Sequence, residues 1–406
     1  MLSVKKPEEV LQLIADRFSP APHGEKVSLD QALGRILFQN IVSTEFVPGF
    51  DRSTVDGFAV RAMDTFGCSD AVPAVLRQTG EISMGVPAAG SVETGTCISI
   101  PTGGFVPQGA DAVVMLEYAE AYGDGTIGIS RPVAPGENMI FQGDDVFPGK
   151  VVLSHGRKLN AADIGALAAM GITEVPVYKK PQVAIISTGD ELVSPCCTPQ
   201  AGQVRDVNSP LLQALCTGAG AEAVVYGILK DQADQLYSAI IDAAGKCDVV
   251  LVSGGSSVGM RDITSQALVH AGEILFHGIA MKPGKPTMLG VVSGTPVFGL
   301  PGHPVAVYFV AQIFVRRLIA QLTGRQLRDY AIPAILEENL SANHGRAQYT
   351  PVALRQQGGQ WHAIPIRGKS GLITSLAASD GYLCVPRDCE GIAAGTTVHV
   401  TVYSIE

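Results

Sequence analysis

The sequence DVVLVSGGSSVG at residues 248–259 joins an unbroken apolar run to a turn rich in glycine and serine, and it indicates more about this chain than any other stretch. Apolar runs of this kind are typical of strands buried on both faces of a parallel sheet. Glycines at the end of such a strand let backbone N–H groups turn toward one point, which suits an anion. The stretch therefore predicts a parallel-sheet domain with an anion site at the end of this strand.

Strands and helices alternate on both sides of this stretch, from residue 181 to about residue 322. Buried-strand candidates lie at 183–187, 223–226 and 249–252, and helical stretches lie near 209–218, 232–245, 262–272 and 304–322. This alternation is typical of a parallel sheet with helices on both faces. We therefore expect a doubly wound, mostly parallel α/β domain.

The flanking segments have a different character. Apolar residues recur at helical spacing in 6–18, and a second short helix is expected at 28–34 with Ser28 as its N-cap. Short β-like pieces between glycine and proline turns follow from 45 to about 140, which indicates a compact β-rich module. After Arg325 alternating pieces return, and they predict a small C-terminal barrel or sandwich.

Composition excludes several classes of protein. The 406 residues exceed one ordinary core, so we expect two to four domains, and a hydrophobic content of 46% with 17% charged residues describes a globular chain. A net charge of −9 argues against nucleic acid as a partner, because neutralising phosphates needs a basic surface. Eight cysteines show no CxxC or zinc spacing, the N-terminus carries acidic residues where a signal peptide is apolar, and no run approaches a membrane span. We therefore expect a cytoplasmic protein with no membrane partner.

Two further turns lie within sixty residues of the opening stretch, KPGKP (282–286) and GLPGHP (299–304). Lys282 and Lys285 stand three residues apart in a loop stiffened by proline, and together with the glycine turn they predict a pocket for a phosphorylated or oxyanionic ligand. The glycine spacing fits neither GxGxxG nor the GxxxxGK[ST] phosphate loop. The alternative is that these glycines merely permit a tight strand–helix turn.

Acidic residues recur at loop positions, namely Asp56, Asp145, Glu191, Asp206, Asp231 and Asp262. Any one of them alone is more often a helix cap or a solvated charge. Several of them converging would hold a hard divalent cation through oxygen ligands, and Mg²⁺ is the simplest choice beside a phosphate pocket. We interpret His303, which precedes an apolar helix, as a packed or hydrogen-bonded residue and not as a metal ligand.

Six motifs in chain order resemble those of one known family. They are FDRSTVDGFA (50–59), PTGGFVPQGADAVVMLE (101–117), STGDEL (187–192), SGGSSVGMRD (253–262), MKPGKP (281–286) and GLPGHPVA (299–306). From about residue 5 to residue 403 the chain is similar to the MoeA-like molybdopterin molybdenumtransferases, a family that includes the gephyrin E domain.

The resemblance implies an architecture and a reaction. The architecture is an L-shaped protomer with an elongated N-terminal domain (1–44 and 139–178), an inserted β-rich module (45–138), an α/β molybdopterin-binding domain (179–326) and a C-terminal β-barrel (327–406). Two protomers form a homodimer whose active site lies between the α/β domain of one subunit and the N-terminal module of the other. The reaction inserts molybdate into adenylylated molybdopterin and releases AMP with the help of Mg²⁺. Other cofactor-biosynthesis proteins are further candidate partners.

The resemblance also assigns roles residue by residue. Gly254, Gly255, Ser257 and Gly259 would cradle phosphate oxygens; Glu191, Asp231 and Asp262 would hold Mg²⁺ or order the attacking water or oxyanion; and Asp56, Thr102 and Asp145 would complete the catalytic site across the dimer. Lys282 and Lys285 would attract molybdate with help from Arg346 and Ser370, and Pro301 and Pro304 would fix the neighbouring turn.

Three positions depart from the family pattern. Arg52 stands where the family often has Asn, His303 stands where its last motif often reads GNP, and Phe276–Gly278 lacks a lysine that some members carry. These departures bear on anion affinity and metal choice more than on fold, so a tungstate-specific paralogue is one alternative. A scaffold that anchors a receptor peptide at the dimer is a second alternative, and a nucleotide-pyrophosphate hydrolase that shares the α/β domain is a third.

Overall fold

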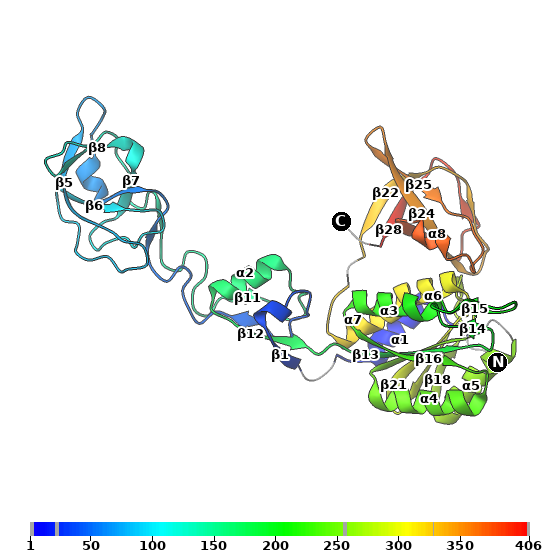
Figure 1. Cartoon of the computed structure of the whole chain (residues 1–406). Helices are drawn as coiled ribbons and strands as arrows, with labels where there is room; N and C mark the ends of the chain where they lie inside the picture. The colour runs from blue at the N-terminus through cyan, green and yellow to red at the C-terminus, as the bar shows by residue number, and fades with distance from the viewer. Residues whose placement is uncertain (1–3, 21–23, 255–257, 328, 404–406) are drawn as a thin grey trace. The chain divides into compact units, whose positions relative to one another are not determined.

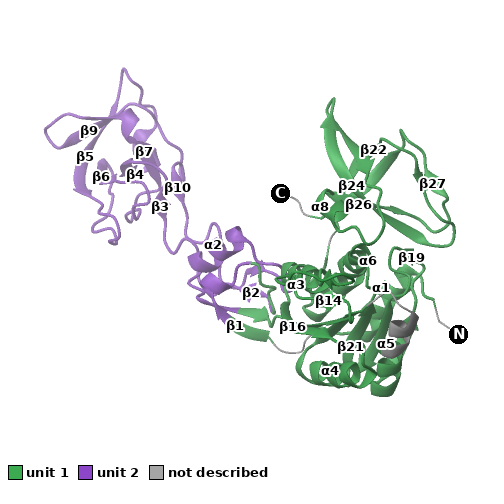
Figure 2. Cartoon of the chain, turned by 45° about the vertical axis from the view of Figure 1, so that its right-hand side comes forward, with its two compact units in different colours: residues 1–26, 34–38, 176–406 green, residues 27–33, 39–175 purple. Residues whose placement is uncertain are grey.

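The computed structural model describes residues 4–20, 24–254, 258–327 and 329–403, except for the side chains of 258–263. The chain divides into two compact units, coloured separately in Figure 2. Unit 1 comprises residues 1–26, 34–38 and 176–406, and unit 2 comprises residues 27–33 and 39–175. Each unit is described by itself.

Unit 1 is built on a six-stranded sheet in the order β16-β13-β17-β21-β20-β18. The strands are β13 (Gln182–Thr188), β16 (Glu222–Leu229), β17 (Val249–Gly254), β18 (Glu273–His277), β20 (Met288–Val292) and β21 (Thr295–Leu300). β13 pairs in parallel with β16 and β17, β17 pairs in parallel with β21, and β20 is antiparallel to both of its neighbours. The predicted mostly parallel sheet is therefore confirmed.

Helices cover both faces of this sheet (Figure 1). α1 (Pro7–Arg17), α3 (Asn208–Ala219) and the helical run α6 (Pro304–Val310), η4 (Ala311–Val315) and α7 (Arg316–Leu322) pack on one face, and α4 (Ala233–Lys246) and α5 (Val258–Ala271) pack on the other. Successive strand residues point to opposite faces. Ile185 and Leu251 accordingly join the first core, while Ile186 and Val252 join the second. Alternating burial on two covered faces is what the doubly wound prediction requires.

The run Pro304–Leu322 corrects one sequence expectation. It is long and apolar enough to cross a membrane by length and composition, so the expectation that no run approaches a membrane span is wrong for this segment. In the structure 67% of its most apolar window is buried inside the protein, as in the core helix of a globular domain.

The C-terminal part of unit 1 is a closed five-stranded barrel, which decides between the barrel and the sandwich. Its strands are β22 (Ala331–Leu336), β24 (Ala347–Gln357), β25 (Gln360–Pro365), β26 (Gly381–Val385) and β28 (Thr397–Val402). They pair in the circle β24-β25-β22-β28-β26 and back to β24. Closure leaves none of these five strands as a free edge.

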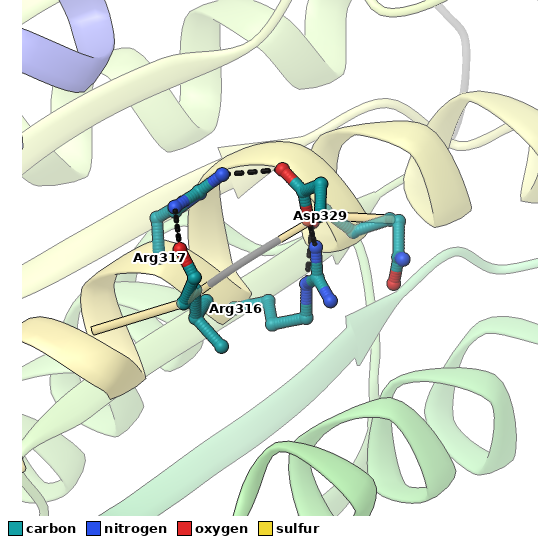
Figure 3. Close-up of polar contacts among 5 residues, drawn as sticks. Arg316, Arg317 and Asp329 are labelled. Carbon is teal, nitrogen blue, oxygen red and sulfur yellow. Dashed lines mark hydrogen bonds and ion pairs between the residues drawn. The ribbon is translucent and has the colours of Figure 1, made fainter. Parts of the chain in front are cut away.

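Two sets of contacts hold the barrel on the α/β part of unit 1. Rings of the helical run meet rings of the barrel, with Phe309 and Tyr382 5.6 Å apart and Tyr308 and Tyr403 5.3 Å apart between centroids. Beside α7, Asp329 pairs with both Arg316 and Arg317 (Figure 3). Arg317 also donates to the backbone oxygen of Leu327 at 3.1 Å, so the segment entering the barrel is tied to the helix before it.

Unit 2 contains a second six-stranded sheet, in the order β7-β4-β6-β5-β9-β8. Its strands are β4 (Gly57–Val60), β5 (Ala74–Glu81), β6 (Thr96–Ile100), β7 (Ala112–Met115), β8 (Ala119–Ala121) and β9 (Thr126–Ile129). The unit also holds α2 (Ala161–Ala169), whose start is capped by Asn160. The prediction of a helix at 28–34 is wrong, because the segment forms only the 3₁₀ turn Leu29–Gln31 and the Ser28 side chain does not cap it.

The multidomain α/β plus β class is thus confirmed. The four domain boundaries given above remain a prediction.

Candidate active site

A cavity of about 770 Å³ opens in unit 1 where the ends of β17 and β21 meet the barrel. The KPGKP loop and the GLPGHP turn form one side of it, and barrel residues around Arg346 and Ser370 form the other. Six predicted substrate-binding residues line this cavity, namely Gly254, Lys282, Lys285, Pro301, Arg346 and Ser370. The fold therefore brings together residues that lie more than a hundred positions apart in the sequence.

The KPGKP loop reaches the barrel through a short strand, β19 (Met281–Lys282), which pairs in parallel with β24. Its turn is closed by a hydrogen bond from the Ile279 N–H to the Lys285 oxygen at 2.9 Å. Gly284 has φ +114°, and a Cβ there would lie 2.9 Å from a methyl group of Val310. Glycine is needed at this point because another side chain would strain the backbone and push the loop off the helix. Both lysines remain exposed.

Two basic residues that the sequence analysis missed, Arg367 and Lys369, also line the cavity. With Lys282, Lys285 and Arg346 they make five cationic side chains, and no Asp or Glu of the described chain is among the lining residues. Arg367 is partly compensated by Glu338 at 3.2 Å and donates to the Asn339 oxygen at 2.9 Å. The sequence feature that could have revealed these residues is the stretch RGKS (367–370), which concentrates hydrogen-bond donors in a loop without periodicity.

Ser370 is fixed by one contact to the GLPGHP turn and one to the residue that follows it. Its Oγ is hydrogen-bonded to Nδ1 of His303 at 2.7 Å, and its backbone oxygen accepts from the Val305 N–H at 3.1 Å. The interpretation of His303 as a hydrogen-bonded residue is therefore confirmed. These contacts join a barrel loop to the start of α6 across the cavity wall.

A smaller hollow of about 300 Å³ adjoins the first, and both share Gly254 and His303. Glu191 and Pro304, both predicted site residues, line this hollow together with Asp206. Asp206 is a helix cap: its Oδ1 accepts from the N–H groups of Asn208 at 3.0 Å and Ser209 at 3.1 Å. For Asp206 the structural interpretation of a loop acid is therefore the right one.

Asp231 lines neither hollow but lies in a group of acids. Its Oδ1 accepts from the Thr188 hydroxyl at 3.2 Å. Burial raises the pKa of the Asp231 carboxyl, and the negative charges of Asp190 and Glu191 raise it further. A cation held by these carboxylates would relieve that repulsion, and carboxylate oxygens are the ligands that Mg²⁺ prefers.

Carboxylate oxygens suit Mg²⁺, but among the described residues no three His, Cys, Asp or Glu side chains stand close enough to hold a metal ion. The third predicted ligand, Asp262, has its side chain outside the described residues, as has Ser257. Gly255 also lies outside them, and Gly259 falls within α5, where only the backbone is described. The roles given to these four residues remain predictions.

In unit 2 the motifs around Asp56 and Thr102 meet each other. Oδ1 of Asp56 accepts from the Thr102 N–H at 2.8 Å. The two loops that make this contact are further joined because the Ser53 N–H donates to the Gly104 oxygen at 3.0 Å. Asp145 lies exposed in the loop after β10 (Met139–Ile140), which pairs with β3 (Arg52–Ser53). The structure thus gathers three motifs in unit 2, and their role in completing the cavity remains a prediction.

Comparisons with known proteins cover almost the whole chain. Residues 5–171 match the MoeA N-terminal region (domain I and II), residues 184–321 match a probable molybdopterin binding domain, and residues 333–403 match the MoeA C-terminal region (domain IV). A molybdopterin molybdenumtransferase of Bacillus subtilis is 32% identical over 388 residues, which are 94% of this chain and 90% of that protein. One from Staphylococcus aureus is 32% identical over 97% of this chain and 94% of its own length. A crystal structure of a molybdopterin biosynthesis MoeA protein from Pyrococcus horikoshii superposes with a TM-score of 0.86 at 35% identity, covering 99% of this chain and 100% of that one.

Proposed function

The chain belongs to the MoeA family of molybdopterin molybdenumtransferases, which are enzymes of molybdenum cofactor biosynthesis, and from that premise we propose that it inserts molybdate into adenylylated molybdopterin with release of AMP. The molybdopterin and the oxyanion are its small-molecule substrates. We further propose that the reaction uses the adenylylated form of molybdopterin and a divalent cation, and that the protein is a cytoplasmic homodimer.

The cavity with five cationic side chains is the observation that carries the proposal. Molybdate is a tetrahedral dianion, and charged donors bind such an ion more strongly than neutral ones. The net charge of the chain is −9, so this concentration of positive charge runs against its overall composition. A local anion site explains it better than a generally basic surface.

The neighbouring hollow supplies the second part of the site. Gly254 at the end of β17 would present its backbone to phosphate oxygens there, and Glu191, which lines the same hollow, would hold Mg²⁺ together with Asp262 and with Asp231 from outside it. When bound, the cation would neutralise the charge of the phosphoanhydride. The carboxylates would also order the water or oxyanion that attacks the adenylylated group.

Asp56, Thr102 and Asp145 would reach this site from the second subunit of a homodimer. The Asp56–Thr102 hydrogen bond supports a shared role, because it fixes the orientation of a carboxylate in an exposed loop. All eight cysteines are unpaired, which supports a reducing compartment such as the cytoplasm.

Turnover of the purified protein tests the proposal. Adenylylated molybdopterin, Mg²⁺ and molybdate should yield AMP and an active cofactor, which is scored by reconstitution of a cofactor-free molybdenum enzyme. Absence of both products would contradict the proposal. Hydrolysis of adenylylated molybdopterin without molybdate, extending to other dinucleotides, would favour the pyrophosphate hydrolase. Stronger inhibition of the molybdate reaction by tungstate than by an equal excess of sulfate would show that the site also selects tungstate.

A further inference from the structure

His303 lies on the boundary between the two hollows, at the residue that precedes α6. Its backbone oxygen accepts from the N–H groups of Ala306 and Val307, so the side chain is not needed to start the helix. The ring instead approaches Ser370, with Nδ1 and Oγ 2.7 Å apart. This short contact joins a titratable ring to a hydroxyl that lines the cationic cavity.

The direction of this hydrogen bond decides what Ser370 offers the cavity. A hydroxyl has one proton and two lone pairs. If the neutral ring carries its proton on Nε2, the bare Nδ1 of His303 accepts a hydrogen bond from the Ser370 hydroxyl, and Oγ faces the cavity with lone pairs that repel an anion. If Nδ1 carries a proton, it donates to Oγ, and the Ser370 proton is free to point at an oxyanion.

We propose that His303 is a positioning residue that sets the direction of the Ser370 hydroxyl, and that its protonated form turns this hydroxyl into a donor for the bound oxyanion. The inference rests on the proposed function, because it takes the cavity as the oxyanion site. Imidazole is the side chain whose charge ordinarily changes between about pH 5 and 8. Oxyanion binding should therefore weaken as the pH rises through this range.

Charged residues line both of the hollows that His303 borders. On the side of the smaller hollow they are Glu191, Arg205 and Asp206, and on the side of the larger cavity they are Lys282, Lys285, Arg346, Arg367 and Lys369. Because linkage is reciprocal, an oxyanion that binds the protonated form more tightly also draws a proton onto the ring.

Calorimetric titration of the full chain with molybdate, from about pH 6 to about pH 8 at constant ionic strength, tests the inference. Wild-type affinity should fall by up to about tenfold per pH unit above the transition, since one proton is linked. Titrations in two buffers of different ionisation enthalpy should show proton uptake on binding. His303→Asn, whose amide can hydrogen-bond but does not titrate, should bind with little dependence on pH and without proton uptake.

Ser370→Ala should also lose the pH dependence, and adding His303→Asn to it should change affinity no further, because the ring acts through the hydroxyl. His303→Gln repeats the test if the Asn variant is unstable. His399→Asn is the matched control, since His399 is exposed on β28 and is not a cavity residue. It should keep the wild-type profile.

The outcomes separate the inference from its premise. A wild-type pH profile in His303→Asn, or additive effects of the two substitutions, would overturn the role of His303 while leaving the oxyanion site intact. Failure of the wild-type chain to bind molybdate at any pH would contradict the proposed function itself.

Discussion

At the scale of single residues, Lys285 is the sharpest test of the cationic cavity. The exposed ammonium lines the cavity on a loop that Gly284 holds in place. Losing one charged hydrogen bond costs about 1.5–3 kcal/mol, so Lys285→Ala should raise the KM for molybdate about 10- to 150-fold. Steady-state kinetics with molybdate varied measure this, and Lys246→Ala, which removes an exposed ion pair with Asp242 on α4, is the control. If only the KM for the adenylylated substrate rose, Lys285 would not be a molybdate-binding residue.

Asp231 predicts a dependence of stability on pH. Its pKa is raised on folding, chiefly by burial and then by Asp190 and Glu191. A carboxyl group with a raised pKa holds its proton more tightly in the folded chain, so its contribution to stability is present at low pH and is lost as the pH rises through the folded pKa. Asp231→Asn should therefore raise the melting temperature at neutral pH in the presence of a chelator, and this gain should shrink in acid. Mg²⁺ should stabilise the wild type more than the variant, and a lower melting temperature at neutral pH would argue against the acid cluster.

At the scale of elements, Asp206 shows why one loop acid is structural. It caps α3, and its Oδ2 accepts a hydrogen bond from the Ser209 hydroxyl at 2.6 Å. The Ser209 oxygen is in turn hydrogen-bonded to the hydroxyl of Ser187 in β13 at 2.8 Å. Asp206→Ala should lower the free energy of unfolding by about 1–2 kcal/mol, as loss of a helix cap does. Asp206→Asn should lower the free energy of unfolding by less, because its amide oxygen can still accept a hydrogen bond. Chemical denaturation measures both variants, and equal losses would mean that the cap contributes little.

Elements were predictable from sequence where they carried an unbroken apolar run or a regular period. The buried runs at 183–187 and 249–252 identified β13 and β17, because a strand covered on both faces has few polar residues. The antiparallel β20 was not predicted, since direction depends on long-range pairing. The expected helix at 28–34 failed because Ser28 is a good capping residue only where a helix follows. Arg367 and Lys369 were missed because a loop has no period, and only the folded barrel places them in the cavity.

At the scale of the whole molecule, the site depends on segments that are distant in sequence. Lys282 and Ser370 meet in one cavity because β19 joins the sheet domain to the barrel. Ordered motifs indicated which residues belong together, yet closure of the barrel and the His303–Ser370 contact follow from packing that no local pattern encodes. Asp56 and Thr102 belong to unit 2 and the cavity belongs to unit 1, so their role in the cavity remains a prediction.

A mixed dimer tests whether the two units act across a subunit interface. Asp56→Asn should give a homodimer of low activity, and Lys285→Ala should do so when molybdate is held near the wild-type KM. A heterodimer that carries one substitution in each subunit, isolated through two affinity tags, should recover about half of the wild-type activity, because one of its two sites then combines an intact cavity with an intact Asp56. Pairing a doubly substituted chain with a wild-type chain should give little activity, since each site then lacks one part. If each chain instead built its own site, the two results would be reversed, and a chain that remains monomeric in sedimentation experiments would contradict the shared site altogether.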